Sequence, residues 1–344
     1  MASIDIEKLL EPVSSEEPCG PNLEYDAAFL ALERTSQGKP EQRMGDSIRA
    51  AEPPEFDAVA RDAAALLARS KDLRVAVQFA RAQTHMRGFQ GLRDGVGLVH
   101  GLLDRYFATV HPLLDPEEGN DPTMRITAVA GLCASELLSA LRTTPLIVSR
   151  TFGPITLRDF AVAAGNATPI GDAPKLELTT IEAAFTDSEL AAHEASAATL
   201  KAAVAHVAGI EQVFERETAG QGPELGALVD LLRQATHAVV SRLEKRQGVA
   251  DAAAAEAAGE AAAAAGGPAR SGQALSGDIR SRADVVRALD KICAYYAEFE
   301  PSSPIPLLLE RGKRLVSKSF LDIIRDMAPA GVPEVESIAG KADA

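Results

Sequence analysis

The sequence predicts an all-α protein, and three observations support this fold class. The chain has 344 residues, of which 46% are hydrophobic, so it is long enough to bury sizeable cores. Only 4% of the residues are aromatic and Trp is absent, which disfavours a fold rich in strands. Apolar residues also recur at steps of three and four along most of the chain. We therefore expect helices that pack through small and aliphatic side chains.

Residues 1–150 are predicted to form an N-terminal helical domain. A polar, irregular stretch from Ser36 to Pro54 is predicted to be an exposed loop, and Gly88 is predicted to stop a helix. Residues 146–155 contain β-branched side chains around a Gly-Pro pair, which is compatible with a small hairpin. The expected helices are Ser3–Leu10, Tyr25–Arg34, one from Pro54, one restarted by Ser70 or Asp72, Gln90–Val110, and one carrying Ile126, Val129, Cys133, Leu137 and Leu141.

The helix from Gln90 to Val110 has the most regular apolar pattern. Its apolar positions alternate in steps of four and three, which is typical of a seam that packs against another helix: Leu92, Val96, Val99, Leu103, Tyr106 and Val110. Gly95, Gly97 and Gly101 cost helix propensity of roughly 1 kcal/mol each relative to Ala. We expect close helix packing to compensate.

Residues 151–246 are predicted to form a middle helical domain. Thr156 and Asp159 have the spacing of a capping box at a helix start. Further on, two long helical patterns are separated by a turn at residues 220–223, with an interruption at Thr186-Asp187 before them. Two long helices joined by a short turn predict an antiparallel helical hairpin.

Residues 247–277 are mostly Ala with Gly, and they are predicted to be a flexible linker because they offer no large side chain to bury. The linker leads to a small helical module at residues 278–344. In it, a helix from Ser281 ends near Glu300, because Pro301, Pro304 and Pro306 cannot sit inside one continuous helix. Ser303 and Pro304 then favour the start of a second, amphipathic helix.

This C-terminal module is marginal in size for a monomer, because small domains seldom bury enough apolar surface. Self-association is the natural remedy, so we predict an oligomerisation module, with an intramolecular three-helix core as the alternative. The predicted interface residues are Leu289, Ile292, Tyr296, Phe299, Pro301, Pro304, Leu307, Leu308, Leu309, Arg311, Arg314 and Phe320.

Composition excludes several classes of function. A net charge of -14 disfavours a nucleic-acid partner, since neutralising phosphates needs clustered Lys and Arg. The N-terminus is acidic where a secretory signal is basic, and no run of about 18 apolar residues is evident, so we expect a cytoplasmic protein without direct membrane insertion. Cys19, Cys133 and Cys293 are far apart, which predicts neither a disulfide framework nor a zinc site.

No catalytic, cofactor-binding or metal-binding constellation is predicted. The six histidines lack metal-type pairing, and no phosphate-binding glycine motif follows a strand. The acidic loop around Asp115 to Asp121 lacks the EF-hand spacing, so it is interpreted as a solvated loop. Cys19 beside His111 is the one candidate thiol nucleophile, although Cys19 lies in a Pro-rich turn without an evident base. We therefore expect a protein that is not an enzyme.

Several motifs resemble one known family. The stretches EPCGPNLEYD, RSKDLRVA, GFQGLRDG and HPLLDPEEGNDPTMR together resemble the ImpA-type N-terminal region. The stretch EPSSPIPLLLERGKRLVSKSFLDII is similar to the C-terminal motif of TssA proteins of bacterial type VI secretion systems. These motifs cover most of residues 9–150 and 281–328, whereas the middle region adds almost nothing.

The resemblance implies a structural assembly component of a type VI secretion system. Such a component forms a homo-oligomeric ring through its C-terminal region, is associated with the baseplate, and helps to initiate or coordinate assembly of the tube and sheath. Its partners would be further copies of itself and the baseplate, tail-tube and sheath proteins. Two alternatives remain open, namely a cytoplasmic helical adaptor unrelated to secretion and a cysteine hydrolase that uses Cys19.

Overall fold

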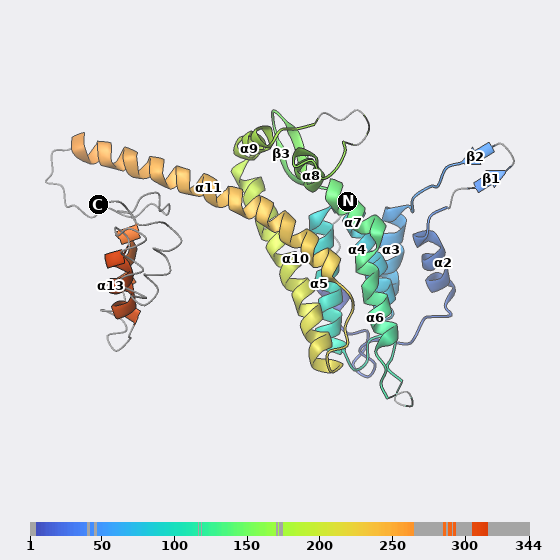
Figure 1. Cartoon of the computed structure of the whole chain (residues 1–344). Helices are drawn as coiled ribbons and strands as arrows, with labels where there is room; N and C mark the ends of the chain where they lie inside the picture. The colour runs from blue at the N-terminus through green and yellow to red at the C-terminus, as the bar shows by residue number, and fades with distance from the viewer. Residues whose placement is uncertain are drawn as a thin grey trace, which may run out of the picture. The chain divides into compact units, whose positions relative to one another are not determined.

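The computed structural model describes residues 5–39, 42–44, 47–115, 117, 119–169, 171, 175–264, 285–286, 288–290, 292–293 and 305–315 (Figure 1). The chain divides into two compact units, Met1–Gln247 and Gly248–Ala344, and each is described by itself. The described part is mostly helical, with two small antiparallel hairpins. The prediction of a mostly helical fold is thus confirmed, although the chain is not purely α-helical.

The first five helices form the N-terminal part of the larger unit, and their starts follow local sequence signals. The side chains of Asp5, Asp26 and Asp72 accept hydrogen bonds from the first free backbone N–H groups of three of these helices. Asp5 takes the capping role that was predicted for Ser3, which lies outside the described residues. The helices are α1 (Ile6–Leu10), α2 (Ala27–Ser36), α3 (Phe56–Leu67), α4 (Leu73–Arg87) and α5 (Phe89–Tyr106).

Helices α3, α4 and α5 pack against one another in sequence order. Gly88 separates α4 from α5 with a φ of 59°, a backbone conformation that a side chain disfavours. The predicted seam of α5 is buried along most of its length, although the helix ends at Tyr106 and Val110 follows in a turn. Close packing at the α5 glycines is confirmed, since a Cβ atom at Gly95 would lie 2.4 Å from the Cβ atom of Ala80 in α4.

Two predictions in this part are wrong. The predicted loop between Ser36 and Pro54 contains an antiparallel hairpin of β1 (Gln42–Met44) and β2 (Ser47–Arg49), whose strands satisfy their backbone polar groups by pairing with each other. The single helix predicted over residues 126–141 is divided into α6 (Thr123–Ala130), the 3-10 turn η1 (Gly131–Cys133) and α7 (Ser135–Thr143). Ala134 has an extended ψ of 137°, which ends the first helix before the second begins.

The short hairpin predicted around residues 146–155 is present. It consists of β3 (Pro145–Ser149) and β4 (Gly153–Thr156), paired antiparallel with a register irregularity near Pro145. The capping box predicted at Thr156 and Asp159 is also confirmed, and it starts α8 (Leu157–Ala163). The side chain of Ser149 donates to an Asp187 carboxylate oxygen at 2.6 Å, which fixes the hairpin to the C-terminal end of α9 (Leu178–Asp187).

The remaining helices are α9 (Leu178–Asp187), α10 (Leu190–Glu217) and α11 (Gly226–Ala264). Their polar contacts are consistent with the predicted antiparallel arrangement of α10 and α11, since His193 near the start of α10 bonds the Val239 carbonyl oxygen at 2.9 Å. Helix α10 also packs along α5, so one continuous core runs from Leu9 to Leu243 (Figure 1). The boundary predicted between residues 150 and 151 therefore falls inside one compact unit.

The Ala-rich stretch differs from the prediction where the structure describes it. Helix α11 continues to Ala264, so residues 247–264 of the predicted flexible linker are helical. The physical reason is the high helix propensity of Ala, which extends a helix already nucleated in the core. The rest of the predicted linker, residues 265–277, lies outside the described residues.

One segment passes the length and hydropathy test for a membrane span, in contrast to the sequence expectation. Thr123–Thr143 is 21 residues long with a mean hydropathy of 1.4. In the structure this segment is the broken α6–η1–α7 region, and its apolar side chains Val129, Leu132, Leu137 and Leu141 are fully buried in the protein core. Core packing thus accounts for these four side chains, whereas Met124 of the same segment is 56% exposed.

Candidate functional site

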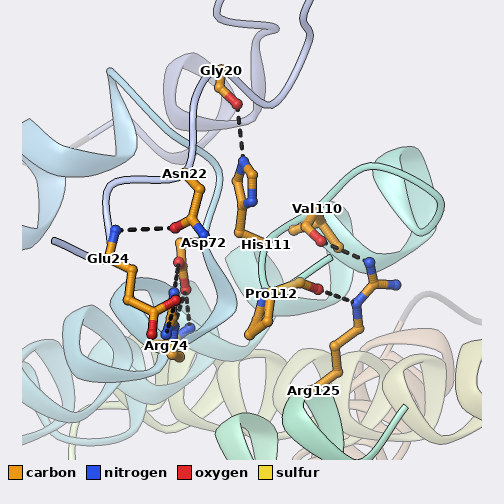
Figure 2. A network of polar contacts seen from close by, with 9 residues as sticks. All are labelled: Gly20, Asn22, Glu24, Asp72, Arg74, Val110, His111, Pro112 and Arg125. Carbon is orange, nitrogen blue, oxygen red and sulfur yellow. Dashed lines mark hydrogen bonds and ion pairs between the residues drawn. The ribbon is translucent and has the colours of Figure 1, made fainter. Parts of the chain in front are cut away.

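Three segments that are far apart in the sequence meet in a polar junction (Figure 2), which we define as residues 19–20, 70–72 and 107–112 together with Arg125. Backbone hydrogen bonds join the segments side by side. The Lys71 N–H donates to the Cys19 carbonyl oxygen at 2.8 Å, the His111 N–H donates to the Lys71 carbonyl oxygen at 3.0 Å, and the Leu73 N–H donates to the His111 carbonyl oxygen at 2.9 Å. The polar junction lies next to the C-terminal ends of α1, α3 and α5 and the start of α4.

Lys71 is a buried cation in the polar junction. Its side chain is 2% exposed, and Nζ donates to the carbonyl oxygens of Leu9 at 2.8 Å and Leu67 at 2.9 Å. These oxygens are the unpaired acceptors near the ends of α1 and α3. Burial lowers the pKa of Lys71, against the opposing charges of Cys19 and Glu11. The lysine thereby ties α1 to α3 at their C-terminal ends.

Asp72 starts α4 and organises the edge of the polar junction. Its Oδ1 atom accepts from the Arg74 N–H at 2.8 Å, and its Oδ2 atom pairs with an Arg74 guanidinium nitrogen at 2.9 Å. Arg74 also lies 3.4 Å from a Glu24 carboxylate oxygen and stacks over the Phe29 ring at 4.8 Å (Figure 2). This charged group joins the loop before α2 to the start of α4.

Arg125 of α6 is the second buried cation of the polar junction, and its side chain is fully buried. Its guanidinium donates to the carbonyl oxygens of Pro112 and Val110, both at 2.7 Å (Figure 2). It also donates to the carbonyl oxygen of Phe107. Its carbon Cζ lies 4.9 Å from the centre of the Phe107 ring. Burial lowers the pKa of Arg125 to about 10, so the side chain stays charged at neutral pH. One side chain thus fixes the whole turn that follows α5.

The polar junction does not have the geometry of a thiol-based active site. Burial is the main cause that raises the pKa of the Cys19 thiol, against a 3.3 Å contact with Thr109 Oγ1 and the charges of Lys71 and Arg125. The Nε2 atom of His111 bonds the Gly20 carbonyl oxygen at 2.9 Å, so this nitrogen is already engaged (Figure 2). A buried, protonated thiol is a poor nucleophile, which disfavours the cysteine hydrolase alternative.

Other chemistry is also not evident in the described part of the chain. Among the described residues, no group of three or more His, Cys, Asp and Glu side chains could hold a metal ion. An open cleft of about 800 Å³ lies beside α2, α3 and α4, and at its edge Phe56 stacks on His85 with ring centres 3.9 Å apart. Its lining carries both signs of charge, including an ion pair of Arg81 with Glu136, so it selects no particular class of ligand.

The predicted oligomer interface lies in the smaller unit, where helix α13 (Ile305–Leu315) confirms the amphipathic helix expected after the prolines. On α13, Leu308 is 69% exposed and Leu309 is half-buried. Lys313 forms ion pairs with Asp290 and, at 3.7 Å, with Glu310, so the helix contacts the segment that carries the predicted Leu289 and Ile292. Ile292 is 44% exposed, whereas Leu289 is half-buried.

The other predicted interface residues are only partly covered by the structure. Arg311 is exposed on α13, and Leu307 and Arg314 belong to α13 without a described side chain. The remaining predicted residues lie outside the described residues: Tyr296, Phe299, Pro301, Pro304 and Phe320. The interface therefore stays a prediction.

Sequence reasoning assigned no role to Lys71 and Arg125, and it considered His111 only as the neighbour of the candidate thiol Cys19. Each lies in a stretch that was singled out as a family-like motif, but the motifs were treated as separate pieces of chain. His111 and Arg125 each stand beside apolar residues near a helix end, whereas Lys71 lies between Ser70 and Asp72 and gives no such signal. The structure adds that three of these motifs, EPCGPNLEYD, RSKDLRVA and HPLLDPEEGNDPTMR, meet at one polar junction.

Comparison with known proteins gives consistent results. Residues 10–134 match the family described as ImpA, N-terminal, type VI secretion system. The chain is 43% identical over 98% of its length, and 98% of the relative's length, to a type VI secretion system component TssA1 of Pseudomonas aeruginosa.

A solved structure is also similar in fold. It is the N-terminal domain, including the conserved ImpA_N region, of the TssA component of the type VI secretion system from Burkholderia cenocepacia. The likeness has a TM-score of 0.57 at 23% sequence identity, and it covers 72% of this chain and 96% of that chain. At this identity the likeness supports the fold alone.

Proposed function

The chain belongs to the TssA family of type VI secretion system components, and from this premise we propose that it is a non-catalytic assembly factor that self-associates through residues 278–344. In this proposal the protein forms a homo-oligomeric ring that is associated with the baseplate. The ring helps to initiate or coordinate assembly of the tube and sheath from the cytoplasmic side. Family membership also removes the alternative of an adaptor unrelated to secretion.

The observation that carries the self-association is the exposed apolar surface of the smaller unit. Ile292, Ile305 and Leu308 are 44%, 39% and 69% exposed. Leu308 belongs to a helix whose other face is charged, where Lys313 is paired with both Glu310 and Asp290. Exposed apolar residues on one face of a helix, with paired charges on the other face, are typical of a helix that packs against another copy of the chain. A ring uses one such patch repeatedly.

The lack of catalysis is supported by the polar junction. Its charged side chains are occupied by backbone carbonyl oxygens, as in Lys71 and Arg125, and its thiol is buried and protonated. Such groups hold segments together and are poorly placed to meet a substrate. Replacing Cys19 with Ala is therefore expected to leave secretion intact, and loss of secretion with a normally folded chain would favour the hydrolase alternative.

The self-association is tested by Leu308→Asp in the full chain. A carboxylate in an apolar contact is costly to desolvate, so we expect the oligomer to dissociate while the larger unit keeps its helix content. Light scattering coupled to size exclusion measures the mass, and circular dichroism measures the helix content. Glu310→Gln, two positions along the same helix, serves as the matched control and should leave the mass unchanged. An unchanged mass for Leu308→Asp would overturn the interface assignment.

A further inference from the structure

Two histidines face each other across the contact between α5 and α10. The Nδ1 atoms of His100 on α5 and His206 on α10 are 3.3 Å apart, with ring centres at 5.5 Å and ring planes inclined by 55°. Both side chains are half-buried. The two rings therefore form a direct side-chain hydrogen bond between the two helices.

Glycines on both helices leave room for the two rings. Gly209 of α10 lies against the His100 ring, and a Cβ atom there would be 2.3 Å from His100 Nε2. In the reciprocal position, a Cβ atom at Gly97 of α5 would be 3.3 Å from His206 Nε2. Each ring thus occupies the space that a side chain on the opposite helix would fill. The histidines have little freedom to turn away from each other while the helices stay packed.

The hydrogen bond depends on the number of protons that the pair carries. A bond between two imidazole nitrogens needs one N–H donor and one lone pair, so at least one ring must be neutral. When both rings are cations, two N–H groups and two positive charges face each other. The same packing that fixes the rings would then hold like charges together.

The charges around the pair do not neutralise a second proton. On α5, Asp94 is the nearby carboxylate, but it already pairs with Arg87 at 2.8 Å and with Arg93 at 2.6 Å. Further along the contact, Asp104 of α5 lies 3.7 Å from Arg216 of α10. Burial, followed by the charges of His100 and Arg93, lowers the pKa of His206, and Asp94 opposes this only in part.

We propose that His100 and His206 form a pH-sensitive latch between α5 and α10, closed while at least one ring is neutral and opened when both rings are protonated. Opening loosens α10 from α5, which is the contact that joins the helical hairpin to the N-terminal helices. The direction follows from proton linkage. Histidines in the unfolded chain bind protons near pH 6.5. In the folded chain, binding of a second proton by the pair is unfavourable because it places two cations side by side. The contact is therefore stable at neutral pH and weakens as the pH falls below about 6.5.

Hydrogen exchange of the full chain at about pH 7.5 and about pH 5.5 tests the latch, after correction for intrinsic exchange. In the wild type, amide protection in the middle of α10 should fall about tenfold or more on acidification. In His206→Asn this pH-dependent loss should disappear, whereas in His100→Asn it should shrink, because the like charge of the partner is gone but burial still lowers the pKa of His206. His85→Asn is the matched control, since His85 is another half-buried histidine whose pKa burial lowers but which lies on α4 beside Phe56. The His85→Asn variant should keep the pH-dependent loss of amide protection in α10.

The proposal is overturned if the pH-dependent loss persists undiminished in both pair variants, or if His85→Asn alone abolishes it. A measurement on the wild-type chain tests the proposal even if one of the variants fails to fold. NMR titration of the labelled histidines in the wild-type chain should show two separated protonation steps for this pair. Independent titration of both rings near pH 6.5 would equally overturn it.

Discussion

Arg125 and Lys71 are the two largest side chains that are fully buried in the described part of the chain. Burying a charge is unfavourable unless hydrogen bonds replace its water. Here the replacements are backbone carbonyl oxygens, three for Arg125 and two for Lys71. At the residue scale, these two cations therefore act as connectors that satisfy the acceptors at helix ends and in the turn after α5.

Arg125→Met is expected to destabilise the larger unit by about 2–4 kcal/mol, because it leaves buried carbonyl oxygens unpaired. Arg125→Lys should recover only part of this loss, since a single ammonium lacks the forked geometry that reaches three oxygens. Urea denaturation monitored by circular dichroism measures the change. Arg142→Met, at an exposed arginine of α7, is the control and should change stability by less than about 0.5 kcal/mol. Equal stability of the Met variant and the wild type would contradict the connector role.

At the scale of elements, the contact of α4 with α5 depends on glycine. A Cβ atom at Gly91 would lie 1.9 Å from the Gln83 carbonyl oxygen, and one at Gly95 would lie 2.5 Å from the Cα atom of Ala80. A Cβ atom at either position would clash with backbone or near-backbone atoms of α4. These atoms can move only if the whole helix moves. The two helices can therefore approach this closely only where one of them has no side chain.

Gly95→Ala should destabilise the protein by about 1–3 kcal/mol through overpacking, although Ala is the better helix former. Gly248→Ala is the matched control, because Gly248 is also inside a helix but its Cβ atom would meet nothing within 4 Å. The control should keep or slightly raise the helix content. Thermal unfolding by calorimetry distinguishes the two cases. A Gly95→Ala protein that melts at or above the wild-type temperature would show that the close contact is not limiting.

At the scale of the whole molecule, the larger unit closes its core before residue 248. Leu243 is the last residue of that core, and Arg246 donates to the Ser188 carbonyl oxygen at 2.7 Å. Gln247 makes a 3.2 Å hydrogen bond to Glu194 on α10. These contacts anchor the first part of α11 to the rest of the unit, while α11 itself continues beyond it.

A fragment of residues 1–247 is therefore expected to fold on its own and to be monomeric, whereas the full chain is expected to self-associate. Analytical ultracentrifugation of both proteins at equal concentration measures this difference. The fragment should unfold in one cooperative transition, because its helices share one core. A fragment with the same oligomeric state as the full chain would place the association surface in the larger unit.

Local features of this protein were predictable from the sequence because they depend on neighbouring residues. The seam of α5, the capping box at Thr156 and the hairpin around Gly153 were all predicted, since each is decided within a few residues. The predicted helix over residues 126–141 failed because its apolar pattern is continuous while the backbone breaks at Ala134. The amphipathic helix after the prolines was likewise local and was predicted.

The candidate sites, in contrast, depend on residues that are distant in the sequence. Lys71 bonds Leu9 across 62 positions, and His100 meets His206 across 106 positions. No local pattern indicates such partners, because the chain must first fold to bring them together. The sequence by itself determined the helices, their caps and the family-like motifs through local hydrogen bonding and apolar periodicity. Only the tertiary structure decided that three of the motifs meet at one polar junction and that α10 packs on α5, because burial and pairing across distant segments are properties of the packed core.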